Sequence, residues 1–215
     1  MALYMLASPL LTAFLIAAFF QNSHVRSLIL PGIRGVVSGV VLLPVTLLLS
    51  TAIPLIYSGW LLWVRISVLE FLVPGLLGTG AFVVLDLRRS GTDDRRSVVS
   101  ASGFLGGCFF VDTLARVIGT RGLLDGYELF LLPMARSLTI GFIPLLVSAW
   151  AREARPTRFG YLFILVLLPW LLSIAGTLHE LKFHPLAYLV GLFLFFGGVT
   201  AYWFLRMVYL PGQGL

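Results

Sequence analysis

Long apolar stretches separated by short polar ones form the main pattern along this chain. A helix that crosses the hydrocarbon core of a bilayer needs about 20 apolar residues. The pattern therefore predicts one all-α transmembrane domain over residues 1–215, a polytopic membrane helix bundle with about seven transmembrane helices. The predicted spans cover about 3–20, 36–57, 61–87, 99–118, 126–150, 159–177 and 185–208.

The first span resembles a signal peptide only in its apolar character, and short polar segments mark the breaks between the spans. Residues 3–20 have neither the basic start nor the small-residue cleavage site of a signal peptide, so we expect a retained helix. The bundle has six spans if this helix lies in the membrane interface. Glycine, proline and charged residues predict linkers at 31–35, 57–59, 88–97, 151–158 and 179–185. Prolines inside the spans predict kinks at Pro74, Pro133, Pro144 and Pro169.

Composition places the chain in a membrane. Of its 215 residues, 59% are hydrophobic and 11% are charged, whereas about 25% of residues are charged in a soluble domain. The net charge of +6 comes almost entirely from arginine, since Lys182 is the single lysine. In such a chain, arginine-rich loops set orientation and meet anionic headgroups. We therefore expect a lipid bilayer, and no nucleic acid, as the partner of these charges.

The distribution of the basic residues predicts an orientation. Short cytoplasmic loops carry an excess of lysine and arginine. The segments after the first, third and fifth predicted spans, together with Arg206, hold ten basic residues, and the opposite side holds four. The N-terminus is thus predicted outside and the C-terminus in the cytoplasm.

Four charges inside the apolar spans are the candidate site. Asp112 and Arg116 are four residues apart and share one helix face, and Glu70 and Arg136 lie in the third and fifth spans. Ionisable residues in a span usually face the bundle interior and pair. We predict an intramembrane polar cluster in which Arg136 bridges to Glu70, Asp112 or both, with Arg116 reaching the interface. Two interpretations stay open: an ion, proton or substrate site, or a salt bridge that fixes the helices.

Other motifs add packing contacts but no catalytic chemistry. Gly35 and Gly39, and likewise Gly103 and Gly107, form GxxxG pairs that allow close helix packing. A single cysteine excludes an internal disulfide and a multi-cysteine metal site. The histidines of "HELKFH" are five residues apart rather than four, which does not fit the zinc-binding helix HExxH. The sequence predicts no catalytic residue, metal or cofactor, and no enzyme activity.

One region resembles a known family. From "LVPGLLGTGAFVVLDLRRSG" through "SASGFLGGCFFVDTLARVIGTRGLL", over residues 72–124, the chain resembles MreD, the membrane partner in rod-shape elongation complexes. The corresponding residues are Arg88, Arg89, Gly103, Phe104, Gly107, Asp112, Gly119 and Gly122. That family is related in fold to the substrate-binding membrane subunits of vitamin ECF transporters.

The resemblance implies two classes of function. The first is a non-enzymatic membrane scaffold or adaptor that binds partner subunits in a larger complex, here the machinery of cell-wall elongation and cell shape in the bacterial inner membrane. The alternative is a transporter, or a substrate-binding subunit of one, for a small anionic solute held by Arg136.

Overall fold

The computed structural model is all-α, as predicted, and describes residues 2–19, 26–53, 58–87, 94–121, 123–152 and 155–209. Seven helical segments make up these residues. Six of them contain α1 (Ala2–Phe19), α2 (Arg26–Ala52), α5 (Asp94–Gly119), α6 (Leu132–Arg152), α7 (Arg155–Glu180) and α8 (His184–Tyr209). The remaining one runs through α3 (Gly59–Ile66), η1 (Ser67–Leu72), α4 (Val73–Phe82) and η2 (Val83–Leu87), and η3 (Tyr127–Leu131) leads directly into α6.

Within the described residues, five helices are long and apolar enough to cross a membrane. They are Leu28–Ala52, Gly59–Leu85, Ser97–Gly119, Tyr127–Val147 and His184–Leu205. The apolar part of α1, Leu3–Ala18, is shorter. The protein is therefore a multi-span integral membrane protein, and spanning by α1 and α7 stays a prediction.

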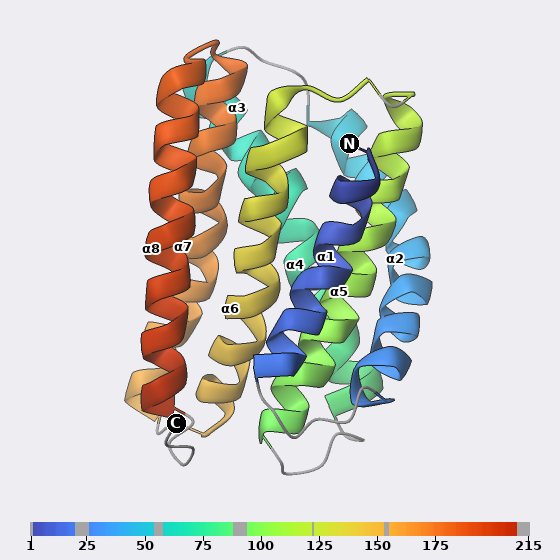
Figure 1. Ribbon diagram of the computed structural model, residues 1–215, viewed down its shortest axis with the longest axis vertical. Coiled ribbons are helices and arrows are strands. Elements are labelled where there is room, and N and C mark those ends of the chain that lie inside the picture. The colour runs from blue at the N-terminus through green and yellow to red at the C-terminus, as the bar shows by residue number, and fades with distance from the viewer. Residues whose placement is uncertain are drawn as a thin grey trace.

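The helices run side by side and alternate in direction (Figure 1). The start of α1 and the end of α8 lie at opposite ends of the bundle. α5 and α6 are the most buried of the five long apolar helices. α1, α2 and α4 pack against α5, while α7 and α8 pack against α6. This order places α5 and α6 where side chains from several helices converge.

Glycines make the contact between α2 and α5 close. A methyl group added at Gly107 would lie 2.7 Å from the backbone nitrogen of Val36, and one at Gly35 would collide with the carbonyl of Phe104. A methyl group at Gly39 would lie 3.2 Å from the Cα of Cys108. Small residues let helix backbones approach in this way. The two GxxxG pairs thus serve packing within the chain.

The predicted linker at 31–35 was wrong, because α2 begins at Arg26 and continues through Pro31. Its proline and glycines resemble loop residues in the sequence. In the bundle, Gly35 packs against Phe104 and a methyl group at Gly32 would lie 3.6 Å from the carbonyl of Gly103. Packing against α5 therefore outweighs the low intrinsic helix propensity of these residues.

The other breaks are shorter than predicted where they are described. α7 continues to Glu180 and α8 starts at His184, inside the predicted linker 179–185. Similarly, α5 starts at Asp94, within 88–97, and α6 and α7 extend into 151–158. Residues 54–57, which include part of the predicted linker 57–59, and residues 88–93 lie outside the described residues. Charged helix ends thus extend beyond the apolar windows that marked the spans.

Two of the predicted prolines coincide with wide helical turns rather than with breaks. Pro74 follows η1, where the N–H of Val73 donates to the carbonyl of Val68, five residues back. Pro133 follows η3, where the N–H of Leu132 donates to the carbonyl of Tyr127. A proline ring clashes with the carbonyl four residues before it. A π-helical turn, with its five-residue spacing, relieves that clash.

Candidate functional site

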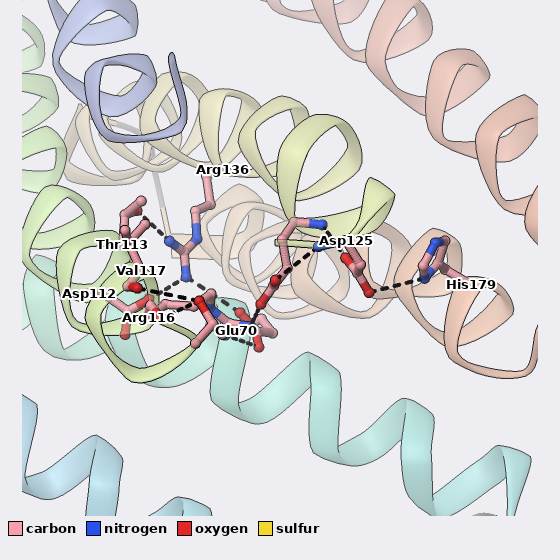
Figure 2. A network of polar contacts seen from close by, with 10 residues as sticks. Glu70, Asp112, Thr113, Arg116, Val117, Asp125, Arg136 and His179 are labelled. Carbon is pink, nitrogen blue, oxygen red and sulfur yellow. Dashed lines mark hydrogen bonds and ion pairs between the residues drawn. The ribbon is translucent and has the colours of Figure 1, made fainter. Parts of the chain in front are cut away.

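A cluster of charged side chains lies between η1, α5 and α6 (Figure 2). Arg136 projects from α6, and one of its terminal nitrogens, Nη2, contacts Oδ2 of Asp112 on α5. The same nitrogen lies 3.4 Å from Oε2 of Glu70 on η1. The other, Nη1, donates to the hydroxyl of Thr113 at 2.6 Å. One guanidinium group therefore links three helical segments.

The surroundings of Arg136 account for this extensive pairing. Its side chain is 2% exposed, and its guanidinium carbon lies 5.5 Å from the centroid of the Phe109 ring, a cation–π contact. The Thr113 hydroxyl also donates to the carbonyl of Phe109 at 2.7 Å, which leaves its lone pairs for Arg136. A buried charge is tolerated when it is paired and hydrogen-bonded. Groups of this chain meet that requirement for both terminal nitrogens of Arg136, whereas its Nε has no hydrogen-bond partner among the described residues.

Arg116 lies in the cluster and contacts two acids. Its Nη2 contacts Oε1 of Glu70, and its Nη1 lies 3.4 Å from Oε1 of Glu128. Its side chain is 27% exposed. Reaching out to water is an alternative to internal pairing for a long cation. Here two acids on neighbouring helical segments make internal pairing the better arrangement.

Glu128 is the member of the cluster that sequence reasoning missed. It lies three residues after Asp125, and each residue bonds the backbone of the other. The Glu128 N–H donates to Oδ1 of Asp125 at 2.9 Å, and the Asp125 N–H donates to Oε2 of Glu128 at 3.3 Å. This reciprocal pair is typical of a helix start. The "DGYE" spacing was the available signal, because it fixes Glu128 at the start of the helix that carries Arg136.

The π-helical turns position both acids that bind Arg116. Glu70 lies within η1 and Glu128 within η3. A π turn changes the direction in which the following side chains leave the helix, and such turns are frequent at functional sites. Pro74 and Pro133 follow these two turns, so we expect the prolines to influence the directions of the two carboxylates.

The network continues toward the end of α7. Asp125 lies 3.8 Å, Oδ2 to Nδ1, from His179, and Figure 2 shows this pair beside the cluster. The rings of His179 and His184 are 4.5 Å apart between centroids. Their closeness was not expected from a spacing of five, and it arises because the turn between α7 and α8 brings the helix ends together. Over the described ranges, no group of three or more His, Cys, Asp or Glu residues is arranged to hold a metal ion.

A groove of about 300 Å³ lies beside the cluster. One wall comes from α2 and the opposite wall from α3 and η1, with α5 as the floor. The lining residues include Leu43, Leu47, Arg65, Glu70, Asp112 and Arg116. Arg136 is not among them. The cluster therefore separates a buried arginine from a groove that carries other charged groups.

The geometry of the cluster favours a structural salt-bridge network over an ion-, proton- or substrate-binding site. Both oxygens of Glu70 are engaged, one by Arg116 and one by Arg136. Asp112 and Thr113 bind Arg136 from α5. Each of these contacts joins helical segments that are far apart in sequence. Opening the cluster to a solute would break several ion pairs at once.

No protein-family model, curated protein sequence or solved structure matches this chain.

Proposed function

We propose that the protein is a non-enzymatic subunit of a larger membrane complex, in which it acts as a rigid scaffold or adaptor for a partner's transmembrane helix. This proposal rests mainly on the hydrogen bonds and ion pairs that Arg136 forms with Thr113, Glu70 and Asp112. Because these partners belong to two other helical segments of the same chain, the contacts hold the helices in one arrangement. A fixed helix arrangement is what a scaffold needs.

The outer face of α8 is the surface that best suits a partner helix. Phe193, Phe196 and Phe204 are exposed there. Gly197 lies between them with open space beside it, and Ala201, also exposed, follows four residues later. Small residues spaced by four allow close helix approach. The corresponding pairs on α2 and α5 are already covered by each other, whereas this one is free for a partner.

The resemblance of residues 72–124 to MreD suggests which complex this is: the cell-wall elongation machinery of a bacterial inner membrane. In that role the N-terminus lies outside and the C-terminus in the cytoplasm, as the ten-to-four distribution of basic residues favours. The proposed partner is a protein of that machinery with a single membrane span.

Photo-crosslinking in native membranes tests the proposal. A crosslinking amino acid at Phe196 should give a discrete protein adduct, whereas one at Val41, which is equally lipid-exposed on α2, should give none. A partner belonging to cell-wall synthesis supports the MreD-type role. The absence of any adduct along the outer face of α8, with the protein extracted as a monomer, would contradict the scaffold role.

A second candidate is a transporter or a substrate-binding subunit, which the charged groove between α2 and α3 favours. An anionic solute held by Arg136, as the sequence suggests, fits poorly because Arg136 is buried and paired. A solute in the groove would instead meet Arg65 and Arg116. If crosslinking at α8 identified a transport ATPase, this candidate would replace the scaffold.

A further inference from the structure

The groove between α2 and α3 contains a cation that no side chain binds directly. Arg65 lines it, and among the described residues Arg65 has no hydrogen bond or close ion pair, although the charge of Glu70 attracts it from beyond ion-pair distance. The other charged residues of the lining behave differently. Glu70 and Asp112 are bound by Arg136, and Arg116 is bound by Glu70. Arg65 is thus the group that an incoming ligand would neutralise.

The depth of Arg65 narrows the choice of ligand. It lies six residues after the start of α3 at Gly59, about 9 Å along the axis at 1.5 Å per residue. With 27 residues, α2 is about 40 Å long, close to the full thickness of a bilayer with its headgroups. The groove therefore starts near the level of the lipid headgroups and extends into the hydrocarbon region.

The walls of the groove change character along its depth. Toward the helix ends it presents Arg65 and Ser50. Below them, Leu43, Leu47 and Leu69 line one side, while the mutually paired Glu70, Asp112 and Arg116 line the other. Leu47 is 57% exposed, so the α2 wall is open to the surrounding lipid. A volume of about 300 Å³ is at the lower end of the range for ligand sites. This combination suits an amphiphile with an anionic head.

The geometry points to a binding site for a phospholipid, whose phosphate contacts Arg65 and whose acyl chain lies along Leu43, Leu47 and Leu69. Arginine is suited to phosphate because its planar guanidinium donates two parallel hydrogen bonds. The Ser50 hydroxyl donates to the carbonyl of Leu47 at 2.7 Å, so it can accept from a headgroup hydroxyl. This lipid site is separate from the proposed partner-binding surface on α8, so an experiment can disprove one proposal without affecting the other.

Native mass spectrometry of the full-length protein in mild detergent, with added phosphatidylglycerol, tests the site. We expect wild type to retain one phospholipid, and Arg65→Gln to lose at least about tenfold in retention, equivalent to one missing charge-assisted contact. Arg121→Gln is the matched control, because Arg121 is exposed outside the groove. Ala115→Phe, which fills the groove floor, should also abolish retention while leaving Arg65 in place.

Three outcomes would overturn the inference. Equal retention by wild type and both groove variants would show that the lipid binds elsewhere. Displacement of the lipid by inorganic phosphate or glycerol phosphate would identify a soluble phosphate ligand instead. A photo-crosslinker at Leu47 that yields a protein adduct, rather than a lipid adduct, would assign the groove to a partner helix.

Discussion

Arg136 on α6 and Asp112 on α5 form an ion pair across 24 positions of sequence, with the arginine buried. Replacing Arg136 by glutamine would leave the Asp112 carboxylate partly buried and without its cation. Removing one partner of a buried pair typically costs about 3–5 kcal/mol. We expect Arg136→Gln to lower the free energy of unfolding by about that amount, measured by SDS titration in mixed micelles.

The exposed Arg121 provides the matched control, since Arg121→Gln removes the same charge from the surface and should change the stability by less than about 0.5 kcal/mol. Exchanging the charges, as Arg136→Asp with Asp112→Arg, should recover part of the loss. Equal stability of Arg136→Gln and wild type would show that the cluster does not brace the bundle.

The partners of Arg136 could be predicted because the physical constraint is strong. A cation in the middle of an apolar span must be compensated, and Glu70 and Asp112 were the acids at similar depth in other spans. The same reasoning included Arg116 in the cluster but did not identify its partners, because Arg116 lies near a helix end where pairing and exposure to water compete. Glu70 and Glu128 both contact it, and the direction of Glu128 depends on the helix start at Asp125.

The hydrophobic pattern also could not predict the local geometry of the helices. Apolar windows locate a span, but they do not distinguish an α-helical turn from the π-helical turns before Pro74 and Pro133. The start of α2 was missed for a related reason. Residues 31–35 have the composition of a loop, whereas in the structure they are helical and pack closely against α5.

The packing of α2 on α5 leads to a second prediction. A methyl group at Gly107 would meet the backbone of α2 at Gly32 and Val36, neither of which can rotate away. Gly107→Ala should therefore destabilise the bundle by about 1–3 kcal/mol, the usual cost of overpacking. Gly80→Ala is the control, because nothing lies within 4 Å of the added group. The same SDS titration measures both, and equal stabilities would contradict a close α2–α5 contact.

The orientation of the bundle can be tested by cysteine labelling. In a Cys108→Ser background, we expect an impermeant maleimide to label Lys182→Cys in spheroplasts, but to label Ser90→Cys and Ala154→Cys only after permeabilisation. The reason is the excess of basic residues around positions 90 and 154. Cys108 is buried, and serine keeps a donor for the Gly35 carbonyl that the thiol contacts at 3.3 Å. Ready labelling of positions 90 and 154 from outside would reverse the topology.

The last prediction concerns the π-helical turn that carries Glu70. If Pro74 holds that turn open, Pro74→Ala permits an ordinary α-helical turn. Removing the extra residue of the wide turn rotates the segment before Pro74 by about 100° relative to the rest of the helix. Glu70 would then point away from Arg116, and their ion pair would be lost.

A double-mutant cycle measures this directly. In the wild-type background, Glu70→Gln and Arg116→Gln should show a coupling energy of about 0.5–3 kcal/mol, as expected for residues in contact. In the Pro74→Ala background the coupling should fall to near zero. Pro169→Ala, inside α7, is the control, since a proline on another helix should leave the coupling unchanged. An undiminished coupling in Pro74→Ala would mean that packing around Glu70, and not the proline, maintains the π-helical turn.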